Sequence, residues 1–196
     1  MISSSNPPTT RKKWYVLRDL KRPIAKDRAW QTLQNRENME VFTPKKWTLR
    51  MENGKRTPKE VPVIPDLLFV HETRDTLDPV VERTSTLQYR FRKGGAQNEP
   101  LVVADGDMER FINVVNSTDT PKYYSMQEIT PDMHRRYIRI VGGPFDGYEG
   151  YLLTTRGSKK KRLLVEIPDL IAASVEVNPE FIQIVHSTPL TPGSSL

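Results

Sequence analysis

Apolar side chains occupy every second position in four short stretches of the last third of the chain. Successive side chains of a β-strand point to opposite faces, so this period of two predicts half-buried strands. Several short strands separated by turns are typical of a small β-barrel. The sequence therefore predicts a β-barrel over residues 134–186, although residues 170–175 are also compatible with a helical turn. The alternating residues are Ile138 and Ile140; Leu163, Val165 and Ile167; Val175 and Val177; and Ile182 and Ile184.

The residues before this region combine the period of two that is typical of β-strands with the period of about 3.6 that is typical of α-helices. Residues 12–20, 39–43, 67–71 and 88–92 have the character of strands, and residues 47–51 and 61–64 that of hairpin arms around an Asn53-Gly54 turn. Helical spacing of apolar residues predicts helices over 24–36, with Pro23 near its start, over 77–83, and from about Asp105 to 116. The predicted fold is therefore α+β over residues 12–117, an antiparallel sheet flanked by helices, followed by the barrel.

Residues 118–133 are rich in Ser, Thr, Pro, Asp, Lys and Gln, which predicts a linker between the two domains. Tyr123 and Tyr124 within it could instead dock on a neighbouring surface. The Ser/Pro/Thr-rich ends, residues 1–11 and 187–196, are expected to be disordered.

The charge of the chain is concentrated in its first third. The 196 residues hold 30 Lys+Arg and 24 Asp+Glu, but residues 11–60 alone hold 15 basic and 6 acidic residues, a net charge of +9. This indicates contact with nucleic acid or an acidic surface, or only a solvated surface that favours lysine. The absence of cysteine excludes disulfides, zinc-thiolate sites and thiol catalysis. Without a long apolar run or a signal peptide, we expect a cytoplasmic protein with no membrane partner.

One segment of the predicted barrel is distinctive. Residues 139–151 read Arg-Ile-Val-Gly-Gly-Pro-Phe-Asp-Gly-Tyr-Glu-Gly-Tyr. Gly142 and Gly143 can form a turn, Phe145 can fill a small core, and Gly147 and Gly150 allow sharp bends. This segment resembles a KOW motif, which occurs in NusG-type transcription factors and in some ribosomal proteins. By itself it is a structural motif and not a catalytic one.

The N-terminal region supplies the second part of the resemblance. Trp14-Tyr15-Val16-Leu17 opens it, Pro44 precedes a basic hairpin, and residues 63–70 read Val-Ile-Pro-Asp-Leu-Leu-Phe-Val. This order is similar to the NusG N-terminal domain, with Ile64 and Leu67 in place of the usual aromatic residues. Residues 101–112 resemble the last helix of UpxY proteins, the NusG paralogues that antiterminate capsular polysaccharide operons.

The resemblance implies a bacterial elongation factor, of the operon-specific antiterminator type, that binds RNA polymerase and suppresses pausing and termination. It implies a monomer without catalytic activity, cofactor or metal. The alternative is a KOW-containing RNA-binding protein of the ribosome or its assembly. His71, His134 and His186 lie far apart in the sequence and lack the spacing of metal ligands.

The resemblance also implies the binding residues. Strand 67–71 is apolar on both faces, so helices can cover one face, and a partner, the second domain, a long loop or the linker tyrosines must cover the other. In the family, that other face binds the clamp helices of RNA polymerase. The polymerase-binding residues implied here are Trp14, Val16, Arg18, Leu67 and Phe69.

Two further surfaces follow from the same reasoning. The hairpin is expected to face DNA near the upstream edge of the transcription bubble. The barrel is expected to bind a small-subunit ribosomal protein or Rho through the turn containing Ile167, Leu170 and Ile171. The basic run over residues 159–162 could contact nucleic acid, or only keep a hairpin tip soluble. The residues of the first hairpin that are expected to face DNA are Lys45, Lys46, Arg50, Lys55, Arg56 and Lys59.

Overall fold

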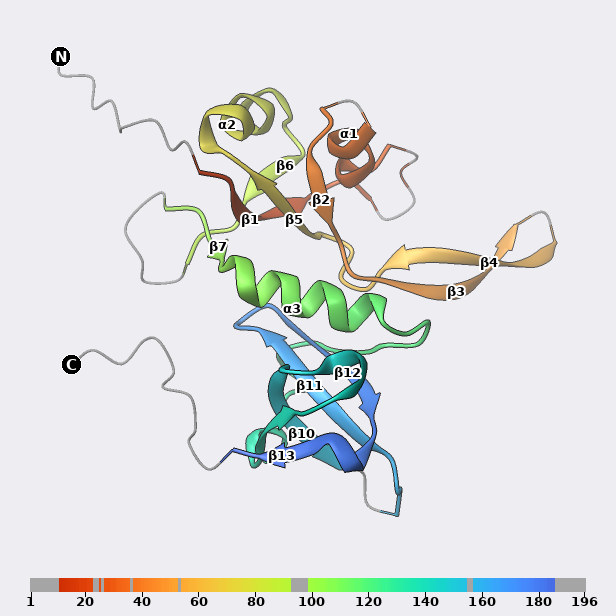
Figure 1. Cartoon of the computed structure of the whole chain (residues 1–196). Coiled ribbons are helices and arrows are strands. Elements are labelled where there is room, and N and C mark those ends of the chain that lie inside the picture. Colours follow the sequence, from red (N-terminus) through yellow and green to blue (C-terminus); the bar gives the residue numbers. More distant parts are fainter. Residues whose placement is uncertain are drawn as a thin grey trace. The chain divides into compact units, whose positions relative to one another are not determined.

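The computed structural model describes residues 11–22, 25, 27–35, 37–52, 54–92, 99–154 and 157–185 (Figure 1). The expected disordered ends apart from Arg11, the helix start at Pro23, the turn residue Asn53 and His186 lie outside these residues. The chain divides into two compact units, Met1–Asp105 and Gly106–Leu196. The division therefore falls before the last predicted helix of the N-terminal region and not after it.

The first unit contains a five-stranded antiparallel sheet (Figure 1). Its strands are β1 (Lys13–Asp19), β2 (Glu40–Phe42), β5 (Leu67–Glu72), β6 (Leu87–Tyr89) and β7 (Val102–Val103). The order is β2-β5-β1-β6, and β7 also pairs with β1. The four predicted strands are confirmed, although the strand expected over 88–92 ends at Tyr89; among the described residues just beyond it, an isolated bridge joins Phe91 to Pro100.

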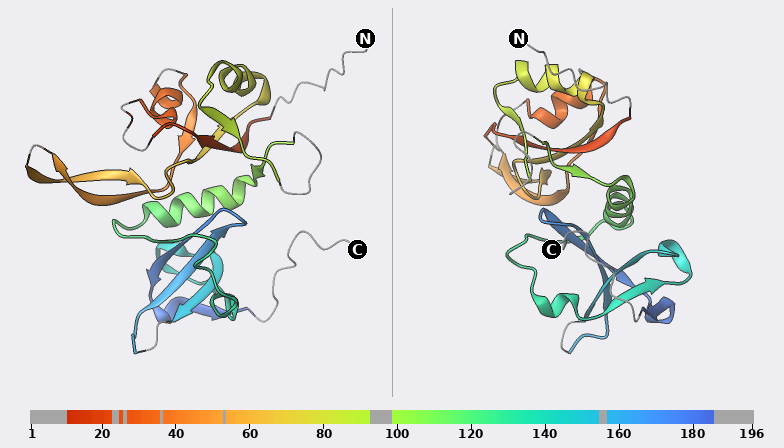
Figure 2. Two further views of the ribbon diagram at one scale, coloured as in Figure 1. Left: turned by 180° about the vertical axis from the view of Figure 1, so that it is seen from behind. Right: turned by 90° about the vertical axis from the view of Figure 1, so that its left-hand side faces the viewer.

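Two helices, α1 (Ala29–Asn35) and α2 (Arg74–Arg83), cover one face of this sheet (Figure 2). Leu33 of α1 and Leu77 of α2 pack in one core cluster with Leu17 and Leu68 of the sheet. α2 begins three residues earlier than its apolar pattern predicted. Thr73 caps this helix, since its side chain accepts a hydrogen bond from the backbone N–H of Thr76.

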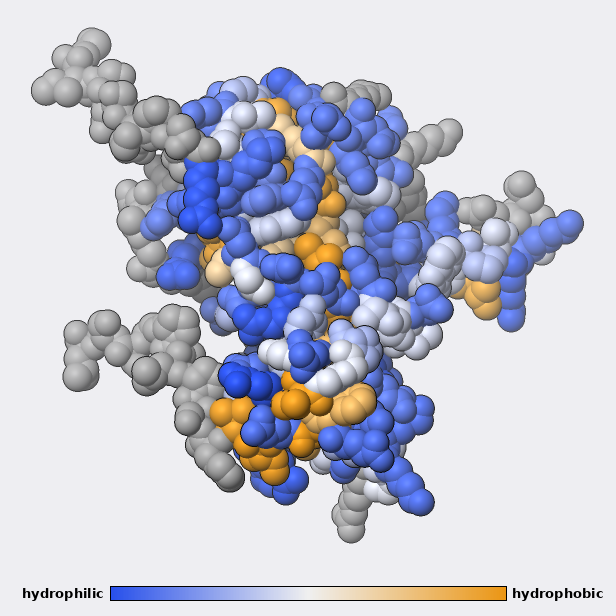
Figure 3. Space-filling view, viewed as in Figure 1, coloured by the Kyte–Doolittle hydropathy of each residue, from blue (hydrophilic) through white to orange (hydrophobic). Residues whose placement is uncertain are grey.

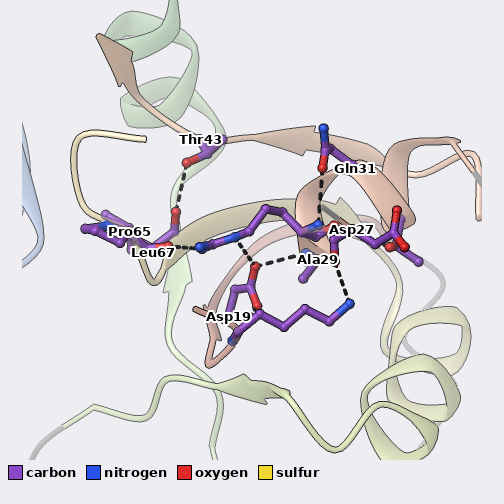
Figure 4. A network of polar contacts seen from close by, with 10 residues as sticks. Asp19, Asp27, Ala29, Gln31, Thr43, Pro65 and Leu67 are labelled. Carbon is purple, nitrogen blue, oxygen red and sulfur yellow. Dashed lines mark hydrogen bonds and ion pairs between the residues drawn. The ribbon is translucent and has the colours of Figure 1, made fainter. Parts of the chain in front are cut away.

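A buried ion pair joins the end of β1 to the start of α1 (Figure 4). One carboxylate oxygen of Asp19 accepts hydrogen bonds from Arg28 Nε at 2.8 Å and from the backbone N–H of Ala29 at 2.9 Å. The other oxygen accepts one from the backbone N–H of Lys21 at 3.0 Å, and Arg28 also donates to the carbonyl of Pro65. Asp19 thus satisfies a free N–H at the start of α1, ten residues further along the chain, and α1 begins at Ala29 rather than near residue 24.

The predicted hairpin is confirmed as a separate two-stranded sheet, β3 (Lys45–Glu52) and β4 (Lys55–Pro62) (Figure 1). A backbone hydrogen bond from Val63 to Pro44 closes its base at 2.8 Å. β4 begins immediately after the turn and not at residue 61. The sequence obscured this arm because Pro58 lies inside it, and proline within a strand is tolerated where the strand has a free edge.

The second unit contains a six-stranded antiparallel sheet in the order β13-β9-β10-β11-β12-β8. Helix α3 (Asp105–Asn116) precedes it, as predicted, and buries Met108, Phe111, Val114 and Val115. The strands are β8 (Lys122–Tyr124), β9 (Tyr137–Ile140), β10 (Glu149–Thr154), β11 (Lys161–Ile167), β12 (Ile171–Val177) and β13 (Ile182–Ile184).

Part of the expected linker belongs to this sheet. β8 pairs with β12, with Tyr123 opposite Ala173 and Tyr124 opposite Ala172. The two tyrosines therefore lie against a neighbouring strand, which was the alternative to a linker. Residues 171–175 form strand and not a helical turn.

The glycine-rich segment between β9 and β10 makes the expected turn. Gly142 and Gly143 have φ angles of 96° and 72°, which strongly favour glycine. Phe145 is buried, with 9% of its surface exposed. Gly150 lies so close to β11 that an added Cβ would approach the carbonyl oxygen of Leu164 to 2.2 Å. None of the helices in the described parts of the chain is long and apolar enough to cross a membrane.

Candidate binding surfaces

The five residues predicted to bind polymerase share one face of the first sheet. On β1 and β5, Val16 is directly opposite Phe69 and Arg18 is opposite Leu67. Trp14 lies two positions before Val16 and therefore on the same face. We call these five residues the sheet face.

Most of the sheet face is covered within the chain. The exposed fractions of Trp14, Val16, Leu67 and Phe69 are 6%, 0%, 2% and 0%. The expectation that this face is open is therefore not met for these four side chains. Arg18 is the exposed member, with 48% of its side chain accessible.

Arg18 belongs to an ion cluster that sequence reasoning did not identify. Its Nε lies 3.1 Å from a carboxylate oxygen of Asp66, and Arg90 Nη2 lies 3.2 Å from the same oxygen. Asp66 immediately precedes β5 and Arg90 immediately follows β6, so only the pairing of both strands with β1 brings these charges together. The cluster fixes the direction of the Arg18 side chain.

His71 extends the sheet face at the other end of β5. Its ring stacks on Trp14 with 4.9 Å between ring centroids, and its Nδ1 lies 2.7 Å from Glu40. Burial alone would raise the pKa of the adjacent Glu72, but hydrogen bonds from the Thr73 N–H and the Lys12 ammonium hold the pKa of Glu72 below its usual value.

Among the described residues, no group of three or more His, Cys, Asp or Glu side chains could hold a metal ion.

The strand register divides the six basic hairpin residues between two faces. Lys46, Arg50, Lys55 and Lys59 share one face, which we call the basic face. Lys45 and Arg56 lie on the opposite face, where Lys45 Nζ is 3.4 Å from Glu60 and lies over the ring of Trp30. Four of the six predicted residues are therefore placed to act together.

The face opposite the basic face carries exposed apolar side chains. Trp47, Leu49 and Met51 are 65%, 62% and 65% exposed. We call them the apolar stripe. Their alternation with Lys46, Thr48 and Arg50 was visible in the sequence, but whether such a face is covered depends on what packs against the hairpin.

The predicted partner surface of the second unit is largely internal. Ile167, Leu170 and Ile171 are 1%, 8% and 0% exposed, and Ile167 pairs with Ile171 at the turn between β11 and β12. The exposed residues of this turn are Pro168 and Asp169. At the opposite end of β11, in the basic run, Lys160 pairs with Glu176 at 2.8 Å and Arg162 Nε donates to Ser174 at 2.8 Å.

Comparison with known proteins finds one family that matches most of the first unit and the start of the second. Residues 12–112, just over half of the chain, match the family described as "Transcription termination factor nusG". The chain therefore belongs to the NusG family of transcription factors. No curated protein matches it.

Among solved structures, the chain is similar to one described as "Domain interaction in Thermotoga maritima NusG". The identity is 14% and the TM-score 0.47, over 90% of this chain and 98% of the other.

Proposed function

We propose that this chain is an elongation factor that binds the clamp helices of RNA polymerase and suppresses pausing and termination, as an operon-specific antiterminator of the capsular polysaccharide type. The observation that carries this proposal is the gathering of Trp14, Val16, Arg18, Leu67 and Phe69 on one face of β1 and β5. Because four of these side chains are buried, contact through them requires that the sheet face first be uncovered. Binding then favours the polymerase conformation to which the factor binds more tightly.

We propose further that the second unit is a KOW-type barrel that recruits a small-subunit ribosomal protein or Rho. The turn glycines and the buried Phe145 are compatible with such a barrel. Because Ile167, Leu170 and Ile171 are buried, the exposed Pro168 and Asp169 of the same turn are the available contact residues.

Arg18 provides the test of the sheet face. A charge placed at Phe69 would enter the protein interior and unfold the first unit, so that substitution cannot isolate binding. Arg18→Glu is expected to weaken binding to the cognate core polymerase by about tenfold. The substitution reverses the charge at the rim of the interface, so the attraction between Arg18 and an opposite charge on the polymerase becomes a repulsion. Equilibrium titration with labelled protein measures this change.

Arg83→Glu is the matched control. Arg83 is an exposed arginine of α2, 55% accessible, and pairs with Glu37 much as Arg18 pairs with Asp66. Since α2 covers the other face of the sheet, this variant should bind like the wild type. Equal affinities for the wild type and Arg18→Glu would contradict the assignment of the sheet face.

The basic face of the hairpin supports contact with DNA near the upstream edge of the bubble. Each phosphate contact contributes about 0.9 to the slope of log affinity against log salt. Lys46→Gln combined with Lys55→Gln should therefore reduce the slope for a forked DNA by about 2. Lys45→Gln with Arg56→Gln removes the same charge from the opposite face and should leave the slope nearly unchanged. Fluorescence anisotropy across a salt series measures both, and equal slopes for the two double variants would exclude the basic face as the contact.

A further inference from the structure

The apolar stripe is an unusual feature for a segment in water. Three large side chains, Trp47, Leu49 and Met51, follow one another on one face of β3, and each is more than 60% exposed. Residues two apart in a strand lie about 7 Å from each other, so the stripe extends over about 14 Å. Trp and Met are enriched in the buried centres of protein interfaces. In the space-filling view, apolar surface appears on the projecting hairpin among hydrophilic neighbours (Figure 3).

The residues of β4 beside the stripe define the chemistry of what can cover it. Pro58 lies opposite Leu49 and continues the apolar surface, and Glu60 lies opposite Trp47. Glu60 pairs with Lys45. Arg56, opposite Met51 at the hairpin tip, has no ion pair with any other described residue. A complementary surface is therefore apolar along most of its length and carries a carboxylate at the end that meets Arg56.

This pattern disfavours nucleic acid as the occupant of the stripe. The four side chains that could neutralise phosphates together lie on the basic face. Of the stripe residues, only Trp47 has a ring on which a base could stack. A nucleic acid strand would therefore bind the basic face and leave the stripe in water.

A second copy of the chain is disfavoured by charge. Residues 45–62 hold six basic and two acidic residues, a net charge of +4, so two hairpins brought together would repel each other. A protein surface with an acidic residue avoids this repulsion and pairs with Arg56.

We propose that the apolar stripe is a second contact with RNA polymerase, distinct from the sheet face, and that it binds an apolar protein surface ending in a carboxylate. The inference rests on the proposed function, since it takes the polymerase as the partner. The hairpin would then lie between protein on its apolar face and nucleic acid on its basic face.

The test uses the full chain and purified cognate core polymerase without nucleic acid. Leu49→Glu places a charge in the centre of the stripe and should weaken binding about tenfold or more. Arg56→Glu should weaken it severalfold by repelling the carboxylate. Thr48→Glu is the matched control, because it introduces the same charge at the adjacent position on the basic face and should leave polymerase binding unchanged. Since Leu49 is largely exposed, its variant should keep the wild-type melting temperature.

Each other outcome overturns the proposal in a distinguishable way. If the wild type does not bind the polymerase, the proposed function fails and the inference fails with it. If the wild type binds and Leu49→Glu binds equally well, only the inference fails. Loss of binding to a single-stranded oligothymidine by Leu49→Glu, with polymerase binding intact, would assign the stripe to nucleic acid. A dimer in the wild type that Leu49→Glu dissociates would assign it to a second copy.

Discussion

Asp19→Ala is expected to destabilise the first unit by about 3–5 kcal/mol, because it leaves the buried Arg28 guanidinium without its counter-charge. The side chains of Asp19 and Arg28 are only 2% and 7% exposed. The substitution also removes the acceptor for the Ala29 N–H at the start of α1. Trp14, Trp30 and Trp47 are the only tryptophans of the chain, so tryptophan fluorescence during urea denaturation reports on the first unit alone.

Two variants serve as controls for this result. Arg11→Ala removes an ion pair of the first unit, with Asp105, in which the two side chains are 80% and 49% exposed, and should change stability by less than about 1 kcal/mol. Asp19→Ala combined with Arg28→Met should be more stable than Asp19→Ala alone, since the uncompensated charge is gone. A cost for Asp19→Ala no larger than that of Arg11→Ala would show that burial of the Asp19–Arg28 pair contributes little.

Gly150→Ala is expected to destabilise the second unit by about 3 kcal/mol. The new methyl group would lie 2.2 Å from the carbonyl oxygen of Leu164, so β10 and β11 must separate where they pair. Backbone atoms cannot rotate aside as a flexible side chain can, and the strain must spread into the strand pairing. Thermal unfolding followed by the amide NMR signals of β10 and β11 measures the change.

Gly106→Ala is the control for Gly150→Ala. Gly106 lies in α3, and no heavy atom would come within 4 Å of its added Cβ. Alanine there should be neutral or stabilising by up to about 1 kcal/mol, because it reduces the freedom of the unfolded chain. If both glycine variants unfold at the wild-type temperature, the close approach at Gly150 is not a constraint on the sheet.

Strands with a strong local pattern were predictable from the sequence. β1 and β5 each contain four consecutive apolar residues, Trp14–Leu17 and Leu67–Val70, β11 alternates at Leu163, Val165 and Ile167, and all three were identified. β8 was missed because Lys122–Tyr124 has no alternation of its own, and its pairing depends on β12, about fifty residues further on. The start of α1 was misplaced for a similar reason, since its capping carboxylate comes from Asp19.

The candidate surfaces were predictable in part. The period of two placed the members of the sheet face on one side of their strands, but burial is a property of the folded chain, and four of these residues proved to be covered. The basic residues of the hairpin were recognised by charge. Their division into two faces required the register of β3 with β4, which the misplaced second arm obscured.

The prolines of β4 bear on how the protein behaves at high concentration. Pro58 and Pro62 have no N–H to donate, so the free edge of β4 is a poor template for another strand, whereas β3 contains no proline. Growth of an ordered aggregate needs two open edges on every molecule, so that each added strand exposes a new site. A hairpin with one open edge can pair once and then stops, and this asymmetry protects an exposed apolar ribbon from fibril formation.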